Sequence, residues 1–368
     1  MKIVDITVDQ LRLELDPPFA AAWDPVPRTA FDATVVRVHT DAGLTGIGSG
    51  DTMAGFDAYR HLFLGTDPLD ISRHVRAIES ANFHGAKYWP LEAALWDIIG
   101  KASGQPVSML FGNAAKRLRA YASTGELKTP EQRVEASLEM AKTGFRALKI
   151  RIDRHRLDEG VDVVRAVREA LGDGVDLMVD LNQSWRMPGD VEPAMDFAKV
   201  RGVVRRLAEL DVFWVEEPLP YADVAGFRAL RSTGVRIAAG EMQSSIPELL
   251  AYLEADALDV YQMDVVLAVG MHRARTLAEL ARLKHRQFTP HSWTNGIGVL
   301  ANLHVAAGVG ATPYFEFPYD PPGWTPARRD FMLDQPLMID VDGDLVVPAS
   351  PGLGIDLDES AIDATRTA

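Results

Sequence analysis

Three short apolar runs, each ending close to an acidic residue, decide how this chain folds: VDLMVDLN at 175–182, FWVEEP at 213–218 and RIAAGE at 236–241. The acidic residues Asp180, Glu216 and Glu241 are 36 and 25 residues apart, about one strand plus one crossover helix. Three successive βα units would place these carboxylates at the same end of neighbouring parallel strands. Such carboxylates repel one another unless a cation holds them, and an all-oxygen site suits Mg²⁺, with Mn²⁺ as the alternative. The sequence therefore predicts a metal site.

The remaining strand candidates extend this pattern to eight strands, and the other five are 120–123, 147–152, 257–264, 287–292 and 313–317. Helical patterns separate the strands, as at 131–144, 159–172 and 271–286. Eight apolar strands that alternate with helices predict an α/β fold, a modified (β/α)₈ barrel of the TIM type. We expect residues 116–335 to form this barrel as the catalytic domain.

The two ends of the chain have different patterns. Residues 1–50 alternate as a β-meander and residues 56–104 have helical periodicity, which predicts an N-terminal α+β capping domain over residues 1–115. Residues 336–368 contain a hairpin turn at 342–344 and are expected to return to that domain. Gly46, Gly48 and Gly50 superficially resemble a phosphate loop, but no helix follows them directly, so phosphate binding is not favoured.

Composition excludes several classes of protein. The 368 residues carry a formal net charge of −14 and no cysteine, which argues against nucleic-acid or anionic-membrane binding and excludes disulfides. The N-terminal stretch alternates like a strand and has no signal-peptide pattern, and no apolar run is long enough for a membrane span. We therefore expect a cytoplasmic protein. The negative net charge does not exclude an anionic substrate, because a bound dication and a few lysines can dominate the local electrostatic field in a cleft.

Nearly every predicted strand ends in a polar residue on the side where barrel active sites lie. Strand 147–152 contributes Lys149 and Arg151, which face the same side because they are two residues apart. The other strand ends contribute, besides the three acidic residues, Asn182, Asp264, His291 and Glu316. Each one alone could be a solvated strand-end group, but seven strands in register make coincidence improbable.

Seven short motifs follow one another along the predicted barrel: KIR at 149–151, DLN at 180–182, WVEEP at 214–218, GE at 240–241, QMD at 262–264, PHSW at 290–293 and FEF at 315–317. Together they resemble the mandelate racemase group of the enolase superfamily, which also includes muconate lactonizing enzyme-like members. The resemblance implies Mg²⁺-dependent removal of a proton next to a carboxylate, through an enediolate intermediate. It also implies that Asp180, Glu216 and Glu241 are the metal ligands and that Asp264 orients the base His291.

The sequence departs from the racemase pattern at Arg151, where that pattern has a second lysine as the base on the opposite face. Guanidinium is a poor base, and a racemase needs two bases. The resemblance therefore favours one-base dehydration of a sugar acid to a 2-keto-3-deoxy acid, started by His291. In this interpretation Lys149 binds the substrate carboxylate or the enediolate, and Arg151 holds the carboxylate or a hydroxyl. Glu316 bonds a carboxylate oxygen if it is protonated.

Several alternatives stay open at this stage. Lys149 could instead be a base in an epimerase, and a cycloisomerase needs only one base. A non-catalytic metal- or ligand-binding protein on the same scaffold is the remote alternative. Asn182 stands where some sugar-acid dehydratases of this group have a histidine acid, so we interpret it as substrate-binding.

Two tryptophans and the assembly state complete the expectations. Trp23 and Trp293 either line the pocket or pack the domain interface, and no sequence feature separates these two roles. The expected partner is a small carboxylate substrate, and the resemblance implies a homo-oligomer.

Overall fold

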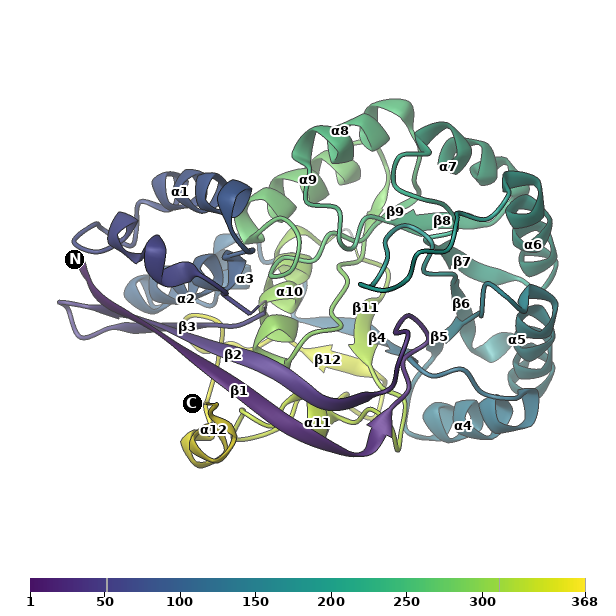
Figure 1. Cartoon of the computed structure of the whole chain (residues 1–368), viewed down its shortest axis with the longest axis horizontal. Helices are drawn as coiled ribbons and strands as arrows, with labels where there is room; N and C mark the ends of the chain where they lie inside the picture. The colour runs from purple at the N-terminus through teal and green to yellow at the C-terminus, as the bar shows by residue number, and fades with distance from the viewer. Residues whose placement is uncertain (51, 311, 368) are drawn as a thin grey trace.

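The computed structural model describes residues 1–50, 52–310 and 312–367 (Figure 1). The N-terminal part is an antiparallel meander of three strands in the order β1-β2-β3, covered by short helices. Its elements are β1 (Ile3–Phe19), β2 (Arg28–Thr40), β3 (Thr45–Gly48), α1 (Ile71–His84), α2 (Trp89–Ser103) and α3 (Val107–Leu110), with short 3₁₀ turns η1 (Phe56–Ala58) and η2 (Arg60–Leu62). The end of the long β1–β2 hairpin reaches the barrel, where the Ala22 backbone N–H donates to the Gly125 carbonyl at 2.8 Å.

All eight predicted barrel strands are present, and they are parallel. They are β4 (Arg117–Ser123), β5 (Ala147–Arg151), β6 (Asp176–Asp180), β7 (Val212–Glu216), β8 (Arg236–Ala239), β9 (Val260–Tyr261), β10 (Gln287–Phe288) and β11 (Phe315–Pro318). The helices between them are α4 (Pro130–Lys142), α5 (Leu157–Leu171), α6 (Phe197–Glu209), α7 (Val224–Leu230), α8 (Ile246–Ala255), α9 (Met271–Leu283) and α10 (Gly296–Val309), with 3₁₀ turns η3 (Gly172–Gly174) and η4 (Arg231–Thr233). They lie outside the curled sheet (Figure 1).

The strand order is β10-β9-β8-β7-β6-β5-β4-β11, so the sheet follows the chain except that β11 joins β4. The two end strands meet through side-chain bonds to backbone: the Ser292 hydroxyl donates to the Glu316 carbonyl and the Thr312 hydroxyl to the Phe288 carbonyl, each at 2.7 Å. The predicted α/β fold, with eight parallel strands curled around a common interior, is confirmed.

The interior of the sheet has an apolar layer beneath a charged one. The apolar layer is a buried cluster of Tyr121, Ala147, Met178, Trp214, Ala238 and Val260. Since strand side chains alternate with period two, the residue two positions after an inward apolar residue also points inward. Lys149 follows Ala147 in this way, and Asp180 and Glu216 likewise stand two residues after members of the cluster. The buried plug therefore fixes where the charged side chains lie.

The C-terminal segment contacts both parts of the molecule and includes α11 (Pro326–Arg329), β12 (Asp344–Val346) and α12 (Glu359–Thr365). Strand β12 pairs antiparallel with β4, and further on the Thr367 N–H donates to the Gln10 carbonyl of β1 at 2.8 Å. We retain the division at residues 115 and 335 as a proposal. Among the described residues, no helix is both long and apolar enough to cross a membrane.

The glycines of β3 have a packing role. A Cβ added at Gly48 would lie 2.0 Å from the Pro90 carbonyl oxygen, and one at Gly46 would lie 2.0 Å from the Ala94 carbonyl oxygen. Both carbonyls belong to α2, so the strand and the helix are in direct backbone contact here. This contact accounts for Gly46 and Gly48 without a phosphate ligand.

We predict that Gly48→Ala lowers the free energy of unfolding by about 2 kcal/mol or more, because rigid backbone must move to admit the methyl group. Gly202→Ala is the matched control, since Gly202 is an exposed residue of α6 with nothing within 4 Å of an added Cβ. This control should be neutral or stabilising by up to about 1 kcal/mol. Urea unfolding of both variants measures the difference, and equal stabilities would contradict the packing argument.

Candidate active site

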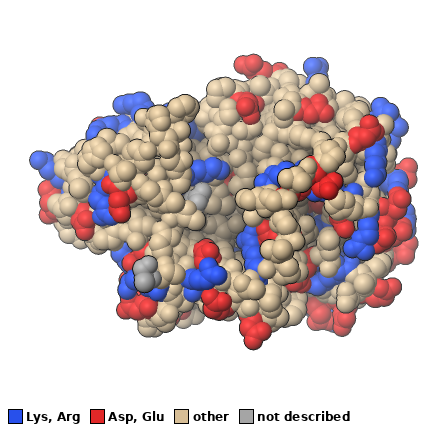
Figure 2. Space-filling view, in the orientation of Figure 1, with Lys and Arg blue, Asp and Glu red and all other residues tan. Residues whose placement is uncertain are grey.

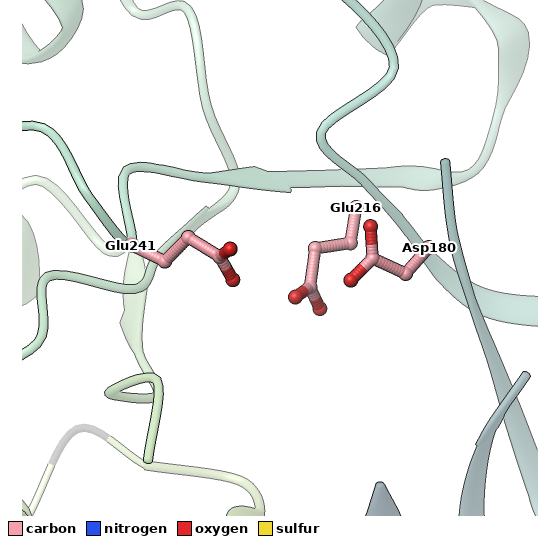
Figure 3. A group of neighbouring side chains, drawn as sticks. All are labelled: Asp180, Glu216 and Glu241. Carbon is pink, nitrogen blue, oxygen red and sulfur yellow. The ribbon is translucent and has the colours of Figure 1, made fainter. Parts of the chain in front are cut away.

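Three buried carboxylates converge at the ends of consecutive strands. Asp180 ends β6, Glu216 ends β7, and Glu241 follows β8, each offering one oxygen, with all three oxygens within 4.8 Å of one another (Figure 3). Asp180 and Glu216 are direct partners in the strand register. Glu241 lies beyond the last strand residue, and the left-handed Gly240, with φ 111°, turns the chain there. The predicted cluster therefore exists, although its third member lies outside the paired strand, where its backbone carbonyl accepts the Asp264 N–H at 3.2 Å.

Two buried cations from β5 lie against this triad. The Lys149 ammonium lies 2.5 Å from Glu216 Oε1, 2.8 Å from Glu316 Oε1 and 3.5 Å from Asp180 Oδ2, and its side chain is completely buried. Burial alone would lower the pKa of Lys149, but Glu216 and Glu316 raise it above its ordinary value. Lys149 is therefore a protonated counter-ion in this structure.

Arg151 is fixed from several sides. Its guanidinium is ion-paired with Asp180, donates to Asn182 Oδ1 at 3.1 Å and donates through Nε to the Thr124 carbonyl at 2.9 Å. It also lies 4.6 Å from the centroid of the Trp23 ring, within cation–π range. Burial opposes the charge, but Asp180 raises the pKa of Arg151, so this side chain stays cationic.

Each triad carboxylate also accepts a neutral N–H. The Asn182 backbone N–H donates to Asp180 Oδ1 at 2.8 Å, the Trp214 indole to Glu216 Oε2 at 3.0 Å, and the Trp185 indole to Glu241 Oε1 at 2.6 Å. Sequence analysis did not assign roles to Trp185 and Trp214. For Trp214 a signal existed, because a residue two before Glu216 must share its face of the strand.

The donor set fits a hard divalent cation. All ligand candidates are carboxylate oxygens, and Glu241 Oε2 is buried with no hydrogen-bond partner within the described chain. Burial raises the pKa of Glu216, and neighbouring Asp180 and Glu241 add to this effect, whereas Lys149 opposes it. A bound cation would relieve the repulsion among these carboxylates. Mg²⁺ and Mn²⁺ are the expected ions, because both prefer oxygen ligands.

The predicted pair of His291 and Asp264 is formed just beyond the neighbouring strands β9 and β10. His291 Nδ1 lies 2.9 Å from Asp264 Oδ2, and Asp264 Oδ1 accepts the Val266 and Leu267 backbone N–H groups at 2.7 and 2.9 Å. The other ring nitrogen, Nε2, lies 3.8 Å from Glu241 Oε2, so the imidazole borders the triad. Burial opposes protonation, but Glu241 and Asp264 raise the pKa of His291 to about 9.

Glu316 differs from the expectation of a protonated group that contacts substrate. Its Oε1 accepts the Ser123 hydroxyl at 2.7 Å and its Oε2 accepts the Ser292 N–H at 2.6 Å. Burial would raise the pKa of Glu316, but Lys149 and His291 lower it to about 2. The carboxylate is therefore ionised, and both of its oxygens accept hydrogen bonds from the protein. The sequence pattern alone does not predict this charge state.

A cavity of about 1100 Å³ opens onto this arrangement, and its lining includes Trp23, Arg151, Asn182, Glu241, His291 and Trp293. Figure 2 shows a hollow between the N-terminal part and the barrel, with basic side chains around it. Trp23 and Trp293 also pack together, with ring centroids 4.9 Å apart. The two tryptophans thus line the cavity and pack the interface at the same time.

Glu217 has a separate role from its neighbour Glu216. Its φ is 45°, and its Oε1 accepts the Tyr221 hydroxyl at 2.7 Å. The side chain is completely buried and bonded to Tyr221, so its hydrogen bond lies outside the triad.

Residues 132–361 match the protein family described as enolase C-terminal domain-like. The chain therefore belongs to the enolase superfamily, with a C-terminal domain like that of the mandelate racemase and muconate lactonizing enzymes. The homologues of this chain include acid-sugar dehydratases, cycloisomerases and racemases.

Individual relatives cover most or all of the chain. It is 30% identical to arabinonate dehydratase of Saccharolobus solfataricus over 72% of this chain and 68% of the relative. It is 29% identical to D-galactarolactone cycloisomerase of Agrobacterium fabrum over 100% of this chain and 99% of the relative. Among solved structures, a racemase from Streptomyces coelicolor A3(2) with bound magnesium is 25% identical, with a TM-score of 0.83 over 99% of this chain and 100% of that one.

We predict that Asp264→Asn lowers the pKa of His291 by about one unit or more in metal-free protein, because the imidazolium loses a neighbouring carboxylate. Since the folded-state pKa exceeds the ordinary 6.5, the imidazolium stabilises the fold below pH 6.5, and this stability is lost as pH rises through about 9. Asp264→Asn should therefore lose less stability than the wild type as pH rises from 6.5 to about 9.

NMR titration of the His291 ring measures the change in pKa. Asp334→Asn, at an exposed carboxylate, is the control and should leave the titration unchanged. An unchanged titration in Asp264→Asn would contradict the electrostatic account of the pair.

Proposed function

We propose that this protein is a divalent-cation-dependent lyase that removes water from a small polyhydroxy carboxylate and gives a 2-keto-3-deoxy acid. The observation that carries the proposal is the asymmetry of the site. An oriented histidine borders the triad on one side, and a fixed guanidinium stands where a second base would be needed. The similarity to arabinonate dehydratase supports the choice of reaction and of substrate class.

Asp180, Glu216 and Glu241 would hold Mg²⁺, or Mn²⁺ as the alternative. When bound, the cation would neutralise Glu241 and stabilise the charge that proton removal places on the substrate carboxylate. The bound magnesium of the related Streptomyces racemase supports this choice of cofactor.

His291 would start the reaction at the carbon next to the substrate carboxylate. The C–H bond breaks, its proton moves to Nε2, and Asp264 stabilises the resulting imidazolium through Nδ1. The electron pair left on carbon forms a C=C bond as the β-C–O bond breaks, and the Nε2 proton joins the departing hydroxide as water. The enol product then tautomerises to the 2-keto acid.

Arg151 would bind the substrate carboxylate or a hydroxyl group, because it lines the cavity and remains cationic. Asn182, Trp23 and Trp293 line the same cavity and are proposed substrate contacts. Lys149 is ion-paired with both Glu216 and Glu316, so we propose that Lys149 and Glu316 position Glu216 and balance its charge.

A cycloisomerase is the second candidate, favoured by the full-length match to D-galactarolactone cycloisomerase. That reaction also needs only one base, so the His291–Asp264 pair is compatible with it.

An epimerase is less compatible, because its second base would be Lys149, which three carboxylates surround. A cytoplasmic location and a homo-oligomeric assembly stay predictions.

We predict that the protein binds one Mg²⁺ per chain and that Glu216→Gln weakens this binding at least about 100-fold, beyond the usual effect of losing an outer-sphere partner. Isothermal titration calorimetry gives the dissociation constants. Glu131→Gln removes an equal charge at an exposed position and should leave them unchanged. Equal affinity in wild type and Glu216→Gln would reject the triad as the ligand set.

We predict that the protein, incubated with Mg²⁺ in D₂O and a panel of sugar acids and their lactones, yields a 2-keto-3-deoxy acid. Proton NMR measures the formation of this product. His291→Asn should abolish the product, and Asp264→Asn should slow its formation about 10²–10⁴-fold. His285→Asn is the matched control, because His285 is exposed and its φ of 57° suits asparagine.

The products separate the candidate functions. Lactone opening or closure without loss of water would favour the cycloisomerase. Stereoinversion with α-deuterium on both epimers would favour an epimerase. Failure to bind Mg²⁺ together with no turnover would favour a non-catalytic binding protein.

A further inference from the structure

Trp185 lies in the loop between β6 and α6, outside the barrel strands that carry the triad. Its indole N–H donates to Glu241 Oε1 at 2.6 Å. In the described part of the chain this is the one hydrogen bond that reaches the Glu241 carboxylate, and the other oxygen, Oε2, is buried without a hydrogen-bond partner. One side chain from a loop thus orients this carboxylate.

The other two triad carboxylates are held differently. Asp180 and Glu216 end paired strands, and each is bonded by a donor two residues away on its own strand or strand extension. Lys149 and Arg151 hold them as well. Glu241 has no such donor on its own strand, because it follows a glycine turn beyond β8, and its ion-pair partner, the His291 ring, lies 3.8 Å from Oε2, too far for a hydrogen bond. Its position therefore depends most on the donor from the loop.

We propose that Trp185 is a positioning residue of the metal centre: by fixing Glu241 Oε1 it presents Oε2 for coordination. This inference depends on the proposed function in requiring that the triad bind a divalent cation. Partners that hold metal ligands in place commonly change metal affinity 10–100-fold, because an unsupported ligand must be ordered when the metal binds.

The same contact links the metal centre to the wall of the cavity. Trp185 and its neighbours Arg186 and Met187 line both the active-site cavity and an adjoining cavity of about 380 Å³. Because the indole ends on a ligand carboxylate, a cation that orders Glu241 also orders the loop, and the coupling is reciprocal. Metal occupancy would therefore restrict the wall against which substrate binds.

The test compares Trp185→Phe, which retains an aromatic ring but loses the N–H donor and part of the indole, with Trp96→Phe, which makes the same chemical change elsewhere. Trp96 also donates its indole N–H to a carboxylate, Glu92 Oε1 at 3.1 Å, but on helix α2. Calorimetry with Mg²⁺ alone should give a dissociation constant about 10–100-fold higher for Trp185→Phe and within about twofold of wild type for Trp96→Phe. Circular dichroism verifies that both variants are folded.

Hydrogen exchange of peptides covering residues 184–192 provides a second measurement, which is made on both the wild type and Trp185→Phe. Mg²⁺ should slow exchange of this loop in wild-type protein, and the protection should shrink in Trp185→Phe. Wild-type affinity in Trp185→Phe, or a loop whose exchange ignores Mg²⁺ while wild type binds it, would overturn the inference and leave the metal site intact. A wild-type protein that binds no Mg²⁺ would overturn both the metal site and the inference.

Discussion

The mutual repulsion of buried carboxylates is the interaction around which the rest of the structure is arranged. Asp180, Glu216, Glu241 and Glu316 lie together at one end of a parallel sheet, where burial and the neighbouring carboxylates raise the pKa of Glu216. Lys149 and Arg151 offset part of this cost, and each contacts a triad carboxylate. These two fixed cations are fewer than the four carboxylates, and the remaining negative charge favours binding of a further cation.

The barrel supplies this arrangement through strand periodicity. Parallel strands in register bring equivalent positions to one edge, and alternation directs every second side chain inward. An apolar plug that includes Ala147, Met178 and Trp214 fills the space below, so the next inward positions carry the charges. Packing and chemistry are therefore set by the same two-residue repeat, and Trp214 contributes to both because its indole also bonds Glu216.

This repeat explains how much could be predicted from the sequence. The eight strands, the clustering of the triad and the contact between His291 and Asp264 follow from motif spacing along parallel strands. The ionised state of Glu316 could not be predicted, since it results from donors on β4, β5 and the segment after β10 that are distant in sequence. The contact of Trp185 with Glu241 likewise depends on the path of a loop, which periodicity does not determine.

Arg151 makes the two sides of the site chemically different. Strands β5 and β10 are separated in the sheet by β4 and β11 on one side and by β6 to β9 on the other, so Arg151 and the histidine that follows β10 approach the triad from different sides. A lysine at position 151 could lose its proton in a desolvated pocket, whereas a guanidinium bonded to Asp180 and stacked near Trp23 keeps its charge. A proton taken by His291 then has no second base to return it on the opposite face. Chemistry in which the same imidazole both accepts and donates the proton, as in the proposed loss of water, requires only the groups that this arrangement provides.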